Sequence, residues 1–318
     1  MTHGTVTRGA FTPHPLLRNA HLQTIAPSFR RTPALALRIE RRELPDGDFV
    51  DLGWCGAGTG PIAVLLHGLS GGFDSKYARG LAQKLIAKNW RCVMLQFRGA
   101  GPEPNRLPRS YHHGDTQDFR ELLELLRARE PDTPLYAVGW SLGGNVLLKY
   151  LGEEGSKSPL TRAVSVCPPF QLKPCAERLS RGFSRVYQRH LLRELKQMIR
   201  TKHARVPLPI DLPRMQGARD FIEFDNAATA IINGFRDADD YYQRASCGGY
   251  LGGIQVPTLI IHSSDDPFMT PAIMPTAERL PPGVTLELCE AGGHVGFVAA
   301  GPGLKAHWWL EDRIPAYL

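Results

Sequence analysis

The stretch Gly139-Trp-Ser-Leu-Gly-Gly144 lies between an apolar run typical of a buried strand and a segment, residues 145–150, typical of a helix. A serine at such a junction is typical of a nucleophile elbow, in which it adopts a strained conformation at a tight strand-to-helix turn. The residues two positions to either side must be small because the chains approach closely there, and Gly139 and Gly143 meet this demand. Ser141 is therefore the candidate nucleophile.

Around this stretch, short apolar runs alternate with helical segments, and a hairpin around Pro45-Asp-Gly47 precedes them. Apolar runs that alternate with helices predict an α/β fold with a mainly parallel sheet covered on both faces. Ligands bind such sheets beyond the carboxyl ends of the strands, so the chemistry is expected there. The predicted strands are residues 62–66, 92–97, 135–139, 163–167, 258–262 and 285–289, and the predicted helices are residues 75–88, 116–127 and 142–151.

About ninety residues separate the predicted strand that ends near Cys167 from the one that starts at Thr258. A parallel crossover needs only one helix, so this connection is far longer than the sheet requires. We expect one α/β domain over residues 1–318, with residues 168–253 as a helical cap insertion over the site. Prolines at positions 207, 209 and 213 would break its helices.

A serine hydroxyl needs a base, and the base needs an orienting acid. Two later segments supply them just beyond predicted strands, in the chain order Ser, Asp, His of the α/β-hydrolase fold. His294, between flexible glycines in Ala291-Gly-Gly-His-Val-Gly-Phe297, is the candidate base. Asp265 and Asp266 compete as the acid, and the position before Pro267 favours Asp266, which leaves Asp265 as a solvated or loop-capping residue.

The oxyanion hole needs two backbone N–H groups aimed at the developing negative charge. Leu142, directly after the candidate nucleophile, is expected to supply one of them. The tight turn His67-Gly-Leu-Ser-Gly-Gly72 should supply the other from Leu69. In this turn we interpret His67 as a structural hydrogen-bonding residue and Ser70 as a turn residue.

Two further patterns carry weaker signals. His113 and Asp118 have the His-x4-Asp spacing associated with some acyltransferases, although Asp115 between them could equally cap the following helix. Residues 173–205 hold ten Lys or Arg against two Glu. Their helical spacing among apolar residues favours the solvated face of an amphipathic helix over a nucleic-acid patch. Contact with anionic lipid headgroups is a third interpretation.

Composition limits the class of protein. The chain has 318 residues, 42% of them hydrophobic and 22% charged, with a net charge of +7, which is an ordinary globular balance. No run is long and apolar enough to span a bilayer, and the start lacks a secretory signal, so we expect a cytoplasmic protein. The six cysteines are scattered and no ligand spacing occurs, so we expect reduced thiols, no metal and no cofactor.

Taken together, these motifs resemble the YheT-like family of α/β hydrolases, which includes bacterial esterases, yeast medium-chain alcohol acyltransferases and mammalian membrane-associated ABHD lipid hydrolases. The similarity covers nearly the whole chain, with Ala20 standing where the family more often has proline. It implies a triad of Ser141, His294 and Asp266 or its neighbour. The segments that carry it are residues 19–24, 44–51, 67–72, 97–101, 139–144, 265–268 and 292–297.

The sequence therefore predicts a serine carboxylesterase that cleaves short- or medium-chain acyl esters through an acyl-enzyme on Ser141. The cap and Trp140 would select the substrate. An alcohol O-acyltransferase with the same triad is the first alternative. A non-catalytic hydrolase-fold receptor or scaffold is an alternative of another class. The expected partner is a small acyl ester, not a nucleic acid, with peripheral lipid contact left open and the oligomeric state undetermined.

Overall fold

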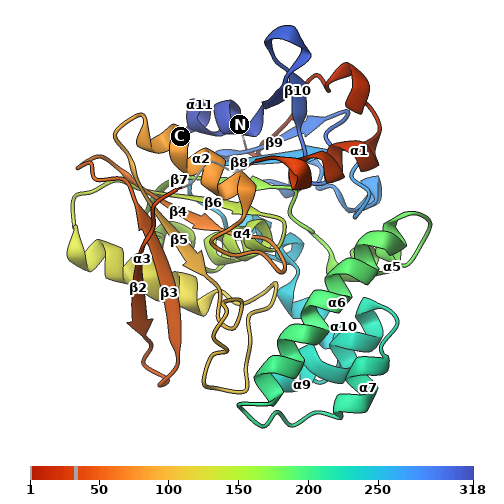
Figure 1. Ribbon diagram of the computed structural model, residues 1–318. Coiled ribbons are helices and arrows are strands. Elements are labelled where there is room, and N and C mark those ends of the chain that lie inside the picture. Colours follow the sequence, from red (N-terminus) through yellow and green to blue (C-terminus); the bar gives the residue numbers. More distant parts are fainter. Residues whose placement is uncertain (1, 32–34) are drawn as a thin grey trace.

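The computed structural model describes residues 2–31 and 35–318, and its centre is a nine-stranded sheet (Figure 1). The strand order is β1-β9-β8-β7-β6-β4-β5-β3-β2, with every neighbouring pair parallel except β5/β3 and β3/β2. The strands are β1 (Thr5–Arg8), β2 (Arg38–Glu43), β3 (Phe49–Cys55), β4 (Ile62–Leu66), β5 (Arg91–Gln96), β6 (Leu135–Trp140), β7 (Leu160–Val166), β8 (Thr258–Ser263) and β9 (Val284–Cys289).

The mainly parallel α/β sheet and its opening hairpin are confirmed, and the predicted strands agree with the structure to within three residues at each end. The edge strand β1 was not predicted. Its four residues, Thr-Val-Thr-Arg, are mostly exposed and pair with β9 across the sheet edge. A short polar edge strand carries no apolar run, so its own sequence gives no signal.

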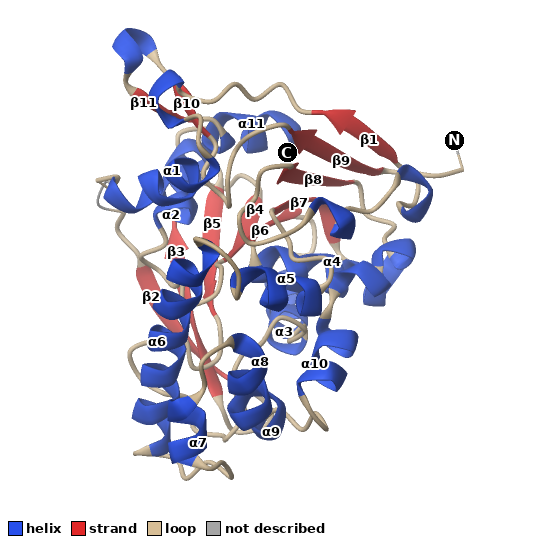
Figure 2. Cartoon of the chain, turned by 90° about the vertical axis from the view of Figure 1, so that its right-hand side faces the viewer, coloured by secondary structure: helices blue, strands red, loops and turns tan. Residues whose placement is uncertain are grey.

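Helices cover both faces of the sheet (Figure 2). On one face, α2 (Lys76–Ile86) and α11 (Leu310–Tyr317) pack together, and Leu81, Leu85 and Ile314 join the core there. On the other face, α3 (Gln117–Arg129) and α4 (Leu142–Glu154) bury Phe119 and Leu147. Smaller elements include α1 (Ala20–Ile25) and a hairpin of β10 (Val298–Ala300) and β11 (Ala306–Trp308).

The long connection between β7 and β8 is helical, and in Figure 1 its helices gather to one side of the sheet. We call residues 168–253 the inserted segment. It has an apolar core of its own, which includes Leu179, Leu195 and Phe224. Its helices are α5 (Leu172–Leu179), α6 (Ser184–His203), α7 (Leu212–Gly217), α8 (Phe221–Phe224), α9 (Ala230–Ile232) and α10 (Ala238–Ala245).

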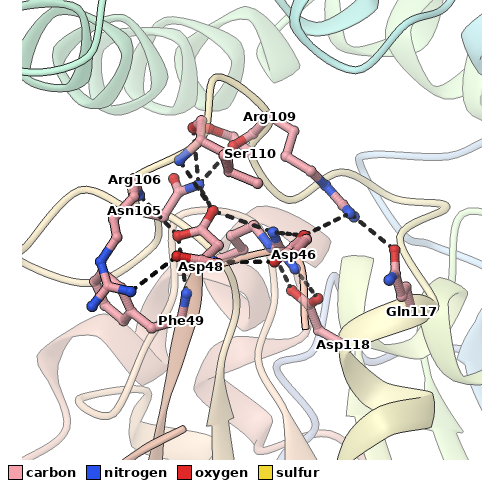
Figure 3. A network of polar contacts seen from close by, with 12 residues as sticks. Asp46, Asp48, Phe49, Asn105, Arg106, Arg109, Ser110, Gln117 and Asp118 are labelled. Atoms are coloured by element: carbon pink, nitrogen blue, oxygen red, sulfur yellow. Dashed lines mark hydrogen bonds and ion pairs between the residues drawn. The ribbon is translucent and has the colours of Figure 1, made fainter. Parts of the chain in front are cut away.

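A buried polar network ties the inserted segment to the sheet domain (Figure 3). Lys202 of α6 donates hydrogen bonds to Asn105 Oδ1 at 2.6 Å, to Ser110 Oγ at 2.9 Å and to the carbonyl of Arg109. Asn105 in turn donates to Asp48 at 2.6 Å. The solvated-face prediction is therefore wrong for Lys202, which is only 1% exposed because it crosses to the sheet domain, although most basic residues of α6 are exposed.

The same network explains the His-x4-Asp spacing. Asp118 pairs with the fully buried Arg98 at 2.6 Å, and Arg98 also binds Asp46 and Asp48. His113 instead shares a 2.9 Å hydrogen bond with the hydroxyl of Tyr241. The two residues of the spacing thus have separate partners. Asp115, the alternative helix cap, forms an ion pair with Arg109 at 2.9 Å, and the side chain of Thr116, at the N-cap of α3, makes no capping hydrogen bond.

Candidate active site

Ser141 lies at the junction of β6 and α4, at the carboxyl end of the central strands. Its backbone has φ 51° and ψ −113°, a left-handed conformation that costs free energy in a non-glycine residue. The flanking glycines are required sterically: a Cβ on Gly139 would lie 2.3 Å from the carbonyl oxygen of Gly143, and one on Gly143 would lie 2.2 Å from that of Leu66. The turn has the geometry expected of a nucleophile elbow.

The structure brings Ser141, His294 and Asp266 together in one chain of hydrogen bonds. Nδ1 of His294 is 2.8 Å from Oδ2 of Asp266, and Nε2 is 2.9 Å from Oγ of Ser141. A carboxylate only accepts, so Nδ1 carries the proton and Nε2 is left free to accept one from the serine. The ring of Phe268 stacks on the imidazole with centroids 4.0 Å apart, which fixes its plane.

The two adjacent aspartates after β8 have different partners. Asp266 is buried at 4% exposure, binds His294 and accepts the N–H of Phe268 at 2.8 Å. Asp265 accepts the N–H of Gly293 at 2.9 Å and does not touch the imidazole. Burial raises the pKa of Asp265, and the Gly293 hydrogen bond partly offsets this. Asp265 is therefore not a freely solvated residue: it holds the loop that carries His294.

The two backbone groups proposed for the oxyanion hole lie beside Ser141. Leu142 is the first residue of α4, where helical N–H groups lack intrahelical partners. The Leu69 N–H makes no hydrogen bond within the described part of the chain, whereas Gly68 donates to Tyr77 and Ser70 donates to Tyr111. Both leucines line the same cavity as Ser141. Their N–H groups are therefore free to bind a ligand oxygen.

The neighbouring His67 makes structural contacts, as the sequence suggested. Its Nδ1 donates to the carbonyl of Gly68 at 2.8 Å, and its Nε2 accepts the N–H of Phe97 at 3.2 Å. Burial lowers its pKa to about 4, so the ring is neutral near pH 7. A neutral imidazole with both nitrogens engaged braces the turn around Leu69.

Sequence reasoning missed the contribution of α1. Oγ1 of Thr24 accepts the N–H of His294 at 2.9 Å. Gln23 is fully buried and binds both the N–H and the carbonyl of Val298, at 2.7 Å and 3.0 Å. The loop between these contacts includes a left-handed residue, Val295, with φ 61°. The motif at residues 19–24 was visible in the sequence, but nothing in it indicated that α1 holds the loop of His294.

A cavity of about 770 Å³ extends from Ser141 into the inserted segment. This is within the range of small-molecule binding sites. Its wall is largely apolar, with Leu179, Leu195, Met198 and Phe221 among its residues. The prediction that Trp140 selects the substrate is wrong: as a strand residue it points to the opposite side, is 1% exposed and packs on Tyr77 with centroids 4.9 Å apart.

A few polar side chains also face this cavity. Burial lowers the pKa values of His112 and His113 to about 3, so both imidazoles are neutral near pH 7. Burial raises the pKa of Asp225 to about 6, while Thr229 and Tyr242 donate hydrogen bonds to its carboxylate at 2.6 Å and 2.7 Å. The cavity therefore offers two neutral imidazoles and one carboxylate whose oxygens already accept hydrogen bonds.

One buried cysteine lies against the Asp–His pair. Sγ of Cys167, a carboxylate oxygen of Asp266 and an imidazole nitrogen of His294 lie within 4.8 Å of one another. The sequence gave no hint of this group because its members come from three different loops. They could reach one ion, but only by competing with the 2.8 Å hydrogen bond between Asp266 and His294. The arrangement therefore suits proton transfer better than metal binding.

This fold and site define a class of protein. A family profile described as "alpha/beta hydrolase fold" matches residues 61–300, and the chain belongs to that family. It is 45% identical to the candidate esterase YheT of Escherichia coli (strain K12) over 315 residues, which is 97% of this chain and 92% of that protein.

Two relatives with lower identity have names that describe other enzymatic activities. Phospholipase ABHD3 of Mus musculus is 31% identical, with 86% of this chain and 69% of that one covered. "Medium-chain fatty acid ethyl ester synthase/esterase 2" of Saccharomyces cerevisiae is 32% identical, with 75% and 58% covered. Among solved structures, the esterase Pf2001 of Pyrococcus furiosus has a TM-score of 0.58 at 16% identity, with 100% and 97% covered, which shows the shared fold.

Across the described residues, every helix is too short or too polar to traverse a lipid bilayer. The cytoplasmic placement stays a prediction.

Proposed function

We propose that the protein is a serine carboxylesterase that cleaves short- or medium-chain acyl esters, with Ser141, His294 and Asp266 as its catalytic triad. The observation that carries this proposal is the pair of hydrogen bonds from Asp266 to His294 and from His294 to Ser141, at 2.8 Å and 2.9 Å, at one end of an apolar cavity. The esterase and phospholipase names of its relatives support it.

In the proposed reaction, Nε2 of His294 accepts the hydroxyl proton of Ser141 as Oγ attacks the ester carbonyl. Asp266 stabilises the imidazolium and holds its orientation. The N–H groups of Leu69 and Leu142 bind the carbonyl oxygen as it becomes negative. The imidazolium then protonates the leaving alcohol, and water activated by the same ring releases the acid and restores the serine.

The inserted segment, residues 168–253, acts in this proposal as a cap that holds the acyl chain. Its apolar side chains, such as Leu195 and Met198, line most of the cavity away from Ser141. Burial of acyl carbons there supplies binding free energy, at about 0.8 kcal/mol for each methylene.

An alcohol O-acyltransferase is the second candidate function, favoured by the yeast relative whose name joins ester synthesis with esterase activity. An alcohol then takes the place of water as the second acceptor, and the triad keeps its roles. The fraction of ethyl ester among the products, measured as the ethanol concentration rises, separates the two activities.

The test is an esterase assay over p-nitrophenyl esters of increasing chain length, together with labelling by a fluorophosphonate probe. Because attack requires the serine oxygen, Ser141→Ala should remove labelling and lower kcat on every ester by on the order of 10⁶-fold. Asp266→Asn should lower kcat by on the order of 10⁴-fold, because the wrong imidazole tautomer is favoured.

Asp265→Asn is the matched control, because it keeps a side-chain oxygen that can accept the N–H of Gly293. It should retain most of the activity. If the wild-type protein is neither labelled nor active, it is a non-catalytic member of the fold and the proposal fails. If Asp265→Asn is the more damaging change, the assignment of the acid is wrong.

A further inference from the structure

The exposed apolar side chains of the molecule are unevenly distributed. Of the nine large ones among the described residues, six belong to three segments: residues 14–31, residues 181–190 of α6 and its approach, and residues 298–308 of the β10–β11 hairpin. Phe29 is 83% exposed and Leu16 is 74% exposed, far more than their burial tendency favours. The six are Leu16, Leu22, Phe29, Phe183, Val186 and Leu304.

These three segments form one surface, which we call the mouth face. His14 joins the first to the hairpin through a 2.8 Å hydrogen bond between Nε2 and the carbonyl of Leu304. The first also meets α6, because the rings of His21 and Phe183 lie with centroids 4.5 Å apart. In both Figure 1 and Figure 2, the β10–β11 hairpin, α1 and α6 follow one another along one side of the molecule.

The cavity that begins at Ser141 opens on this surface. The exposed residues that line it are Ser28 from the first segment, Val186 and His190 from α6, and Ser70 from the turn after β4. Ser28 precedes the exposed Phe29, and Val186 follows the exposed Phe183 by three residues. The apolar side chains therefore surround the route by which an acyl chain reaches the serine.

The three segments of the mouth face carry only basic charges of their own, and at their edge His307 and Arg30 pair with Asp312 and Glu311 of α11. None of its three segments contains an Asp or Glu. Its exposed cations form no ion pair within the described residues, unlike most arginines elsewhere on the surface. Such a surface, with apolar side chains among unpaired cations, is complementary to the headgroups and outer acyl region of an anionic bilayer. The cations are Arg18, Arg31, Arg181, Arg185, Arg189 and Lys305.

We infer that the mouth face docks on an anionic lipid surface and takes its ester substrate from that surface. The inference rests on the proposed esterase function for what happens next at Ser141, but the docking itself does not require catalysis. In this arrangement, Phe29 and Phe183 enter the interfacial region and the arginines of α6 contact lipid phosphates. A lipid acyl ester then passes into the cavity between Ser28 and Val186.

The test is co-sedimentation of the whole protein with two kinds of vesicle, phosphatidylcholine alone and equal parts phosphatidylcholine and phosphatidylglycerol. The wild-type protein should bind the anionic vesicles, and added salt should weaken this binding because it screens the charges. Each basic residue near such a surface contributes about five-fold in affinity. The double variants Arg185→Glu/Arg189→Glu and Phe29→Ser/Phe183→Ser should each bind at least about ten-fold more weakly.

Two control variants change the same chemistry on the edge strand β2, away from the mouth face. Ile39→Ser and Arg42→Glu alter exposed residues there and should bind vesicles like the wild-type protein. Hydrolysis of p-nitrophenyl butyrate, which is soluble, should be unchanged in all these variants. Vesicle binding without hydrolysis would refute the proposed function and leave the docking intact.

The docking inference is overturned if the wild-type protein hydrolyses butyrate but ignores anionic vesicles, or if the β2 variants lose binding as fully as the mouth-face variants. It is also overturned if light scattering shows a dimer that Phe29→Ser/Phe183→Ser dissociates, because a second copy of the chain would then cover the face.

Discussion

The sheet domain and the inserted segment build their halves of the site by different means. In the sheet domain, the main chain determines the geometry: Ser141 and Val295 are held in left-handed conformations, and Gly143 packs against the carbonyl of Leu66 with no room for a methyl group. In the inserted segment, side chains from several helices, above all α6, surround a cavity, and Gly217 at the end of α7 has open space around it. In the proposed reaction, the main chain of the sheet domain thus sets the geometry at Ser141, and side chains of the inserted segment set the shape of the cavity.

The strongest test of this difference is to make the same glycine-to-alanine substitution in both regions. Gly143→Ala would place a methyl group 2.2 Å from the carbonyl oxygen of Leu66. We expect it to lower the free energy of unfolding by about 3 kcal/mol and to abolish labelling by a fluorophosphonate, since the elbow must shift. Gly217→Ala should change stability by no more than about 0.5 kcal/mol. Urea unfolding followed by circular dichroism measures both.

If Gly143→Ala and Gly217→Ala lowered the free energy of unfolding equally, the tight elbow would not explain the difference between the two regions. If Gly143→Ala proves too unstable to purify, Gly139→Ala offers a second probe, because its Cβ would lie 2.3 Å from the carbonyl of Gly143.

The contrast also explains what could be predicted from sequence. Ser141 and His294 were identifiable because tight turns demand glycines at fixed neighbouring positions, a local constraint that sequence records. The choice between Asp265 and Asp266 rested on the distance from the strand end and on the position before Pro267, and the folded structure gives the two residues separate partners. A local sequence pattern cannot assign different partners to two adjacent aspartates, since only the folded loop distinguishes them.

Contacts between distant segments were not predictable. Thr24 and His294 are 270 positions apart, and Lys202 reaches Asn105 across 97 positions. No local pattern encodes such pairs, so the sequence indicates neither the contact of α1 with the His294 loop nor the burial of Lys202. The prediction that Trp140 selects the substrate failed for a different reason. Side chains alternate between the two faces of β6, and this alternation turns the Trp140 ring away from the cavity.

The role of the inserted segment can be tested by filling its cavity. Leu195→Trp adds bulk to a cavity-lining position of α6, so long acyl chains should lose part of their binding site. If about two methylenes are displaced, kcat/KM for p-nitrophenyl octanoate should fall about ten-fold or more, while p-nitrophenyl acetate is cleaved as before. The ratio of the two rates measures the effect.

Gln197→Trp, at an exposed position of the same helix, is the control and should leave the ratio unchanged. An equal fall for both esters in Leu195→Trp would mean that the inserted segment shapes the catalytic geometry as well, and the division between the two halves would fail.

Lys202 joins the sheet domain to the inserted segment, and its titration should change stability without a direct effect on turnover. Burial lowers its pKa to about 7, against the opposing influence of nearby Asp48, while Arg98 and Arg109 lower it further. In the unfolded chain the pKa returns to about 10.4, so between these values the unfolded state binds more protons and stability rises with pH. The free energy of unfolding of the wild-type protein, minus that of Lys202→Met, should therefore rise by up to about 1.4 kcal/mol per pH unit from pH ~7 to ~8.5.

Below pH ~7 this difference should level off, because lysine is then protonated in both states. Arg200→Met, which removes an exposed charge from the same helix, should follow the wild-type pH dependence, because arginine does not titrate in this range. A Lys202→Met profile parallel to that of the wild-type protein would mean that the ammonium stays charged in the interface. The link between the halves would then be a permanent ionic contact, with Lys202 paired to Asp48 through Asn105 at every pH at which the protein is folded.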